Sequence, residues 1–344
     1  MKVAVIGTTG YGGIELLRIL HSHPVFQIQS IHSTKGEVPI WKEYPHLFNI
    51  NNQVLEVINP EEIAEKSDLV FLATPSGVSG QLAAQFAEFN IKLVDLSGDL
   101  RLKNTDEYTQ WYKHEAAPKE IIDKAVYGLT EWSREQVAGA QWISNPGCYS
   151  TASLLGLGPI VKEKLIDPSS IIIDAKSGTS GAGRKPTRTT MHAEMSENFK
   201  IYKVNEHQHI PEIEQGIAMF ADIETTITFN THLIPMTRGI LATSYAQVMP
   251  GVTNKQLNDC LLETYKNHPF VRVVQDVSSI GTNRVKGSNY CDIFAQLDER
   301  TNRATIVGVI DNLVKGAAGQ AIQNMNVQTE LPQTLGLDVI PLFI

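Results

Sequence analysis

The chain begins with an apolar run that passes directly into a glycine-rich turn and then into a helical pattern. Residues 2–6 read KVAVI, and "GTTGYGGIELLRIL" follows with aliphatic residues at helical spacing. A strand, a tight turn and a helix in this order predict the first unit of a parallel sheet. Gly7, Gly10 and Gly13 lie where a pyrophosphate approaches the backbone at a helix start, so the turn predicts a dinucleotide site. A glycine-rich turn without a ligand is the alternative, because the spacing differs from the common G-x-G-x-x-G.

The first half of the chain continues to alternate between strand-like and helix-like segments. Strand patterns occupy residues 26–31, 68–74, 91–98 and 141–145, and helical patterns occupy 13–23 and 78–89. This alternation predicts an α/β, Rossmann-like domain with a doubly wound parallel sheet and right-handed crossovers.

The pattern changes after residue 148. A helix is expected at 151–165, a strand at 170–178, and five further strands at 227–235, 240–249, 270–276, 289–298 and 303–311. Only one clear helix, at 254–267, interrupts these five, which predicts an α+β domain with a largely antiparallel sheet. We expect the first domain to span 1–147, completed by a C-terminal helical segment at about 312–344, and the second, catalytic and oligomerisation domain to span 148–311.

Composition narrows the classes of partner. The net charge is −8, from 29 basic and 37 acidic residues without a long basic block, which disfavours nucleic acid. No apolar stretch approaches the roughly 20 residues that a membrane span needs, and the N-terminus lacks the apolar region of a signal peptide. The three cysteines contain no CxxC pair, which argues against a disulfide framework and against a metal site. A cytoplasmic protein is therefore expected.

One cysteine stands in an unusual context. Cys260 and Cys291 lie in a helical and a strand pattern and are interpreted as ordinary buried thiols. Cys148, in "SNPGCYST", follows a chain-breaking Pro-Gly and precedes a helical run. A helix N-terminus stabilises a thiolate, which is the nucleophilic form. The residues alone leave Cys148 open between a core thiol and a nucleophile.

A nucleophile needs a proton partner, and two histidines are candidates. His207 and His209 lie in "NEHQHIPEIEQ", just before Pro211 opens an expected helix. Residues two apart share a face only in an extended segment, so the spacing does not decide which histidine reaches the cysteine. Two helix-entry histidines with ordinary hydrogen bonds are the alternative, and a zinc site lacks further ligands.

Basic residues near small ones suggest anion binding. The expected second strand ends in "IHSTKGE" without the acidic residue that usually binds the ribose of NAD, and Ser33, Thr34 and Lys35 could bind a 2′-phosphate. This favours NADP, with a solvated loop as the alternative. Arg101, Arg184 and Arg238 could each bind a substrate phosphate or carboxylate through the guanidinium fork, or be solvated at the surface.

Several long motifs together resemble the N-acetyl-γ-glutamyl-phosphate reductase family and, more distantly, the aspartate-semialdehyde dehydrogenases. They include "GTTGYGGIELLRIL", "FLATPSGVS", "VDLSGDLRL", "YGLTEW", "SNPGCYSTA", "AKSGTSGAGRKP", "NEHQHIPEIEQ", "HLIPMTRGIL", "GSNYCDIF" and "DNLVKGAAGQAIQNMN". The resemblance implies NADPH-dependent reductive dephosphorylation of N-acetyl-γ-glutamyl phosphate in arginine biosynthesis, with release of inorganic phosphate. It implies that Cys148 forms a thioester. It also implies that one of the two histidines is the acid/base, with His207 as the first choice and His209 as the second. A homodimer or homotetramer is expected.

The resemblance also extends to the remaining site residues. The resemblance implies that Asn312 and Gly316, in the motif "DNLVKGAAGQAIQNMN", lie near the cofactor. The expected cofactor-binding residues are Gly7, Thr9, Gly10, Tyr11, Gly12, Gly13, Ser33, Lys35, Pro75, Ser76, Ser177, Gly178 and Asn312. The expected substrate-binding set is Arg101, Asn145, Arg184, Glu212 and Arg238. Ser76 departs from the family pattern, in which a histidine is expected at that position.

Three other functions compete with this interpretation. A reductase acting on aspartyl phosphate would use the same chemistry, and only the long motifs, such as "HQHIPEIEQ", favour the acetylated substrate. A cofactor-binding sensor would have no need of the thiol at Cys148. A cysteine hydrolase would leave the N-terminal glycine turn unexplained.

Overall fold

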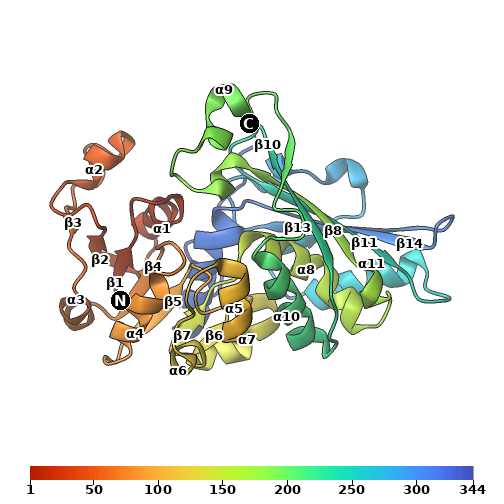
Figure 1. Ribbon diagram of the computed structural model, residues 1–344, viewed down its shortest axis with the longest axis horizontal. Coiled ribbons are helices and arrows are strands. Elements are labelled where there is room, and N and C mark those ends of the chain that lie inside the picture. The colour runs from red at the N-terminus through yellow and green to blue at the C-terminus, as the bar shows by residue number, and fades with distance from the viewer. Residues whose placement is uncertain (344) are drawn as a thin grey trace. The chain divides into compact units, whose positions relative to one another are not determined.

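The computed structural model describes residues 1–343, which form two compact units (Figure 1). The first unit contains Met1–Pro146 and Ala318–Leu337, and the second contains Gly147–Ala317 and the tail from Asp338. Within residues 1–343, no helix has the length and apolar character needed to cross a membrane.

The first unit is built on a seven-stranded, fully parallel sheet. The strand order is β3-β2-β1-β4-β5-β7-β6. All four residues of β4 and the last four of β1 are fully buried, because helices cover both faces of a parallel sheet. The strands are β1 (Lys2–Ile6), β2 (Gln27–His32), β3 (Leu55–Glu56), β4 (Leu69–Leu72), β5 (Lys92–Asp95), β6 (Ala125–Tyr127) and β7 (Trp142–Ser144).

Eight α-helices belong to the described part of this unit. The expected helices at 13–23 and 78–89 correspond to α1 and α4, whereas the short helices between the later strands have no clear sequence pattern. The bounds are α1 (Tyr11–His21), α2 (Ile40–Glu43), α3 (Pro60–Lys66), α4 (Ser79–Phe86), α5 (Thr105–Tyr112), α6 (Lys119–Ile122), α7 (Thr130–Gly139) and α12 (Gly319–Gln328).

The second unit is built on a mixed sheet in the order β12-β13-β14-β11-β8-β10-β9. Four of its six strand pairs are antiparallel, which confirms the largely antiparallel sheet predicted from the sequence. Along β11 buried residues alternate with half-exposed ones, since α8 covers one face (Figure 1). The elements are α8 (Cys148–Lys162), β8 (Ile172–Gly178), α9 (His192–Met195), β9 (Lys200–Tyr202), α10 (His209–Ala221), β10 (Thr228–Ile234), β11 (Ile240–Gln247), α11 (Asn254–Tyr265), β12 (Val271–Val273), β13 (Cys291–Asp298) and β14 (Arg303–Ile310).

The C-terminal segment expected to complete the first domain, at about 312–344, is divided between the two units. Residues 312–317 lie in the second unit, where a π-helical turn, η7 (Val314–Ala318), follows β14. The helix α12 lies in the first unit, with every residue buried, and Asn324 donates to the carbonyl of Gly128 at 2.7 Å. The C-terminal part of the first unit therefore begins at Ala318 rather than at 312, and the tail from Asp338 lies in the second unit.

Candidate active site

Cys148 is the first residue of α8, and the preceding Gly147 caps the helix with extended backbone angles and no side-chain cap. The helix begins three residues earlier than the sequence pattern suggests, at the cysteine itself. Thirteen residues, from Tyr149 to Val161, are buried, so the helix is fixed along its length. The Cys148 and Cys260 side chains are both partly exposed, the latter in contrast to the expected buried thiol, whereas Cys291 is buried. Burial raises the pKa of the Cys260 thiol to about 11. Cys148 is thus the thiol presented at a helix N-terminus, where the helix dipole favours a thiolate.

The backbone of Gly316 approaches this cysteine closely. A Cβ atom at Gly316 would lie 2.7 Å from Cys148 Cβ and 3.1 Å from Ile310 Cδ1. Only glycine fits there without displacement. Asn312, four residues earlier, is buried and joins two loops: its Oδ1 accepts from the N–H of Gly239 at 2.7 Å and its Nδ2 donates to Ser180 Oγ at 2.9 Å.

Both histidines are buried at the start of α10. His209 is the first helical residue, two positions before Pro211, and its backbone N–H donates to His207 Nδ1 at 3.2 Å. The ring of Tyr149, next to the cysteine, contacts both imidazoles edge-on, with centroid distances of 5.3 and 6.0 Å. Burial, and then the nearness of His209, lower the pKa of His207 well below its ordinary value, so His207 is neutral at pH 7.

Glu212 connects the histidine helix to the cysteine helix. It is fully buried, and its Oε1 accepts from the N–H of Gly147 at 2.7 Å. Its Oε2 lies 3.9 Å from His209 Nε2, which makes an ion pair whenever His209 carries a second proton. One carboxylate therefore fixes the residue before Cys148 and faces one of the two histidines.

Two tyrosines near the cysteine have no clear sequence signal. The hydroxyl groups of Tyr149 and Tyr202 lie 3.1 Å apart, and burial raises the pKa of each above its ordinary value. Both phenols therefore remain protonated at neutral pH. Tyr149 follows the cysteine in its motif, but Tyr202 lies on β9, a strand of three residues that the sequence does not predict.

In the first unit, the glycine turn has the shape that a pyrophosphate needs. Gly7 has φ +92°, and a Cβ there would lie 2.4 Å from Ala73 O. A Cβ at Gly13 would lie 2.4 Å from Gly7 O, whereas Gly12 faces open space. Gly10 directly precedes the first residue of α1, so unpaired N–H groups of the helix start lie at the turn. These residues fit a dinucleotide.

The other expected cofactor residues of the first unit lie after β2 and β4. The Ser33 hydroxyl is buried and accepts from the N–H of Lys35 at 2.8 Å. The Lys35 side chain is 63% exposed and pairs with Glu43 at 3.1 Å. Pro75 and Ser76 form part of the loop that leads into α4.

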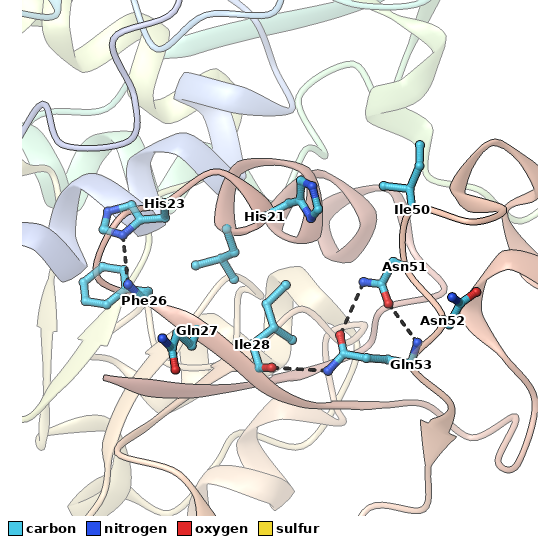
Figure 2. Close-up of a pocket in the computed structure, with 10 residues that line it drawn as sticks. His21, His23, Phe26, Gln27, Ile28, Ile50, Asn51, Asn52 and Gln53 are labelled. Atoms are coloured by element: carbon cyan, nitrogen blue, oxygen red, sulfur yellow. Dashed lines mark hydrogen bonds between the residues drawn. The ribbon is translucent and has the colours of Figure 1, made fainter.

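A separate cavity of about 620 Å³ lies beside the C-terminal end of α1 (Figure 2). In Figure 2 the Gln53 amide donates to the carbonyl of Ile28 at 3.2 Å, and Asn51 donates to Gln53 Oε1 at 3.3 Å. None of the expected site residues lines this cavity, which lies at the opposite end of α1 from the glycine turn.

Comparison with known proteins identifies the family. Residues 2–140 match a model described as "semialdehyde dehydrogenase, NAD binding domain", and residues 148–312 match "semialdehyde dehydrogenase, dimerisation domain". The chain is 52% identical over 344 residues to N-acetyl-gamma-glutamyl-phosphate reductase of Halalkalibacterium halodurans, covering all of both chains. The Bacillus cereus protein of the same name is 51% identical over 346 residues, again covering all of both. The chain belongs to the N-acetyl-gamma-glutamyl-phosphate reductase family.

Solved structures show the same fold with little sequence similarity. Aspartate semialdehyde dehydrogenase II from Vibrio cholerae aligns with a TM-score of 0.72 at 16% identity, covering 96% of this chain and 98% of that one. The N-acetyl-gamma-glutamyl-phosphate reductase family and this dehydrogenase therefore share an architecture, and the identity is too low to carry a substrate from one to the other.

The other residues expected to bind cofactor or substrate in the second unit are Ser177, Gly178, Arg184 and Arg238. Ser177 and Gly178 end β8, and a Cβ at Gly178 would lie 2.8 Å from the Thr237 backbone. Arg184 is half-buried in the loop that follows. Arg238 forms a two-point contact with the fully buried Asp311, at 2.9 and 3.2 Å.

Arg101 and Asn145, two further candidates, are buried in the first unit. Arg101 donates to the carbonyls of Asn145 at 2.8 Å and Leu96 at 2.9 Å. Asn145 Oδ1 accepts from Asn324 of α12 at 3.1 Å. Within residues 1–343, no three His, Cys, Asp or Glu side chains are grouped so that they could hold a metal ion.

Proposed function

We propose that this chain catalyses the NADPH-dependent reductive dephosphorylation of N-acetyl-γ-glutamyl phosphate to N-acetylglutamate 5-semialdehyde, a step of arginine biosynthesis. The full-length similarity to reductases of that name supports the substrate. The observation that carries the chemistry is Cys148 at the start of a buried helix, where Glu212 holds the N–H of Gly147 at 2.7 Å.

The reaction begins with attack of the Cys148 thiolate on the acyl carbon. Phosphate leaves with its electron pair, and a thioester remains on the cysteine. The N–H groups in the first turn of α8 have no partner within the helix and are donors for the oxyanion. A bound nicotinamide supplies the hydride that reduces the thioester. A histidine protonates the oxygen as the thiohemiacetal forms and takes the proton back as the C–S bond breaks, which releases the aldehyde and the thiolate.

The contacts of the two histidines favour different roles. The Nδ1 atom of His207 accepts from a backbone N–H, so neutral His207 carries its proton on Nε2 and is a hydrogen-bond donor for the thiohemiacetal oxygen. His209 faces the carboxylate of Glu212 at 3.9 Å, which suits a group that gains and loses a proton. We therefore assign proton transfer to His209 and oxyanion binding to His207, the reverse of the order that the resemblance implies.

Separate variants test this division of roles. His207→Gln keeps a donor group at the position and should retain more activity than His209→Gln, by about tenfold in kcat. The pH profile of kcat should lose a limb only in His209→Gln. Equal losses, or a limb lost only in His207→Gln, would return the acid/base role to His207.

NADP preference and assembly are parts of the same proposal. Lys35 and Ser33 follow β2, which ends at His32 rather than at an acidic residue, and this supports binding of a 2′-phosphate. The description of the matched family model supports a homodimer or homotetramer built through the second unit. The three cysteines are thiols rather than disulfides, and one of them is the proposed nucleophile, which suits the reducing cytoplasm.

The deciding experiment is phosphate-dependent reduction of NADP by purified protein with N-acetylglutamate semialdehyde, beside aspartate semialdehyde and a Cys148→Ser variant. Turnover of the acetylated substrate alone, abolished in the variant, is expected. Turnover of aspartate semialdehyde alone would move the protein to the other branch of the superfamily. No turnover of either, with NADP still bound, would favour a sensor.

A further inference from the structure

A buried carboxylate in the first unit holds the loop between β4 and α4. Asp99, 1% exposed, lies just after β5. Both of its oxygens accept from the N–H of Gly77 at 2.9 Å, and its Oδ2 also accepts from the N–H of Gly80 at 2.8 Å. Its Oδ1 accepts from the hydroxyl of the fully buried Tyr108 at 2.7 Å. Asp99 therefore makes four contacts, three of them to the backbone of one loop and helix start.

The loop from Thr74 to Val78 is held partly by local contacts, since the Thr74 and Ser79 hydroxyls lie 2.7 Å apart and the Val78 N–H donates to the Pro75 carbonyl at 3.2 Å. Asp99 adds the acceptors for the N–H groups of Gly77 and Gly80. Gly77 is in the left-handed region, with φ +86°. The N-cap residue of α4, Val78, has no side-chain hydrogen bond and the first turn of the helix has no acidic residue. A carboxylate from a neighbouring segment thus takes the place of a local helix cap.

Asp99 is itself held in place from two sides. Ser97 Oγ accepts from the N–H of Asp99 at 3.1 Å and donates to Asp95 Oδ2 at 3.0 Å. The ring of Tyr108 stacks on Tyr112 with centroids 4.6 Å apart. Burial, and then the neighbouring Asp99, raise the pKa of Asp95 to about 6. Asp99 is therefore fixed at its backbone by Ser97 and at its carboxylate by Tyr108.

The strand order indicates which part of a cofactor this loop meets. In the order β2-β1-β4-β5, the glycine turn follows β1 and Lys35 follows β2. Dinucleotides lie across the carboxyl ends of such strands, with the pyrophosphate at the first turn and the adenosine ribose at the second strand. The nicotinamide half then extends the other way, toward the end of β4 and the Thr74–Val78 loop.

We propose that Asp99 is a positioning residue for the nicotinamide half of the cofactor, acting through the backbone of the Thr74–Val78 loop. This inference rests on the proposed function, because it takes the first unit as the cofactor-binding unit. The adenosine half, at β1 and β2, is held by other residues and does not depend on Asp99.

The test compares two probes on the full-length protein. The dissociation constants of NADPH and of 2′,5′-ADP, which lacks the nicotinamide half, are measured by calorimetry for the wild type and for Asp99→Asn, Tyr108→Phe and Asp106→Asn. Asn at 99 offers one acceptor oxygen where the carboxylate uses two, so NADPH binding should weaken about tenfold with 2′,5′-ADP unchanged. Tyr108→Phe should give the same selectivity with a smaller loss, about threefold. Asp106, an exposed acid on α5, is the matched control and should change neither constant.

Each outcome decides the inference. Equal weakening of both probes in Asp99→Asn and in Tyr108→Phe would show general support of the unit and would overturn it, as would unchanged NADPH affinity in both variants. If Asp99→Asn does not fold, Tyr108→Phe alone gives the comparison. NADH and ADP are measured in parallel, so a preference for NAD leaves the test intact. If the wild-type chain bound neither NADPH nor NADH, the proposed function would be overturned together with the role of Asp99. If the wild-type chain binds a dinucleotide and the variants lose no selectivity, only the role of Asp99 is overturned.

Discussion

Replacing Glu212 should disturb the nucleophile through the backbone that precedes it. In Glu212→Ala, the N–H of Gly147 loses the acceptor that lies 2.7 Å away inside a fully buried site. Loss of a hydrogen bond to a buried charged group costs about 1.5–3 kcal/mol, which lowers the melting temperature of a domain of this size by about 5–10 °C. The released N-cap changes the position of the Cys148 thiol, and kcat/KM should fall about 10- to 100-fold.

The Gln variant separates the two contacts of this carboxylate. Glu212→Gln keeps an amide oxygen for the Gly147 N–H, so its stability should stay within about 1 kcal/mol of the wild type. It loses the charge that faces His209 at 3.9 Å, so kcat should still fall and its pH profile should change.

Thermal melts, steady-state kinetics and the rate of Cys148 alkylation by iodoacetamide measure these effects. Glu214 is a matched control on the same helix, since its carboxylate accepts from the N–H of Ile227 at 2.9 Å. Glu214→Ala should lower stability without changing the alkylation rate. Glu212→Ala with normal alkylation and normal kcat/KM would refute the role given to this carboxylate.

Three further predictions follow from single contacts. Gly316→Ala would place a Cβ 2.7 Å from Cys148 Cβ, so kcat/KM should fall at least about tenfold, and wild-type kinetics would contradict the packing. The pKa of His207 is lowered from 6.5 in the folded protein, so its contribution to stability is complete above pH 6.5 and is lost below it, by up to about 1.4 kcal/mol per pH unit; urea unfolding of His207→Gln should lack this slope. Lys35→Glu should shift preference from NADP toward NADH, and unchanged discrimination in kcat/KM would move the 2′-phosphate site away from Lys35.

Features that depend on local backbone geometry are predicted well from the sequence. The apolar run before Gly7 and the helical spacing after Gly13 give β1 and α1, because turn, strand and helix lie within about twenty residues. The Pro-Gly before Cys148 likewise indicates a helix start near the cysteine. The apolar pattern places that start three residues after Cys148, whereas the helix begins at Cys148 itself. The two fold classes follow from the same periodicities.

Hydrogen bonds between a buried carboxylate and a distant part of the backbone are not visible in the sequence. Glu212 meets the N–H of Gly147 across 65 positions, and no local pattern marks this pair. Asp99 lies in the motif "VDLSGDLRL", but its acceptor role toward Gly77, 22 positions earlier, appears only once β4 and β5 are adjacent. Tyr202 is not predicted for another reason: its strand has only three residues, and none of them is fully buried.

Because such contacts are hidden in the sequence, an arginine that looks suited to bind a substrate anion can already be bound to a distant part of the chain. An arginine among small residues suits an anion, and the sequence therefore nominates Arg101 and Arg238 equally. In the structure Arg101 binds two backbone carbonyls, and Arg238 binds a carboxylate 73 positions away that also accepts from the N–H of Gly287 at 2.7 Å. A substrate anion at Arg238 would have to compete with a fully buried Asp311, whose charge would be left poorly compensated. Arg238 is thus better suited to hold the β14–η7 connection, which carries Gly316 to Cys148, than to bind substrate directly.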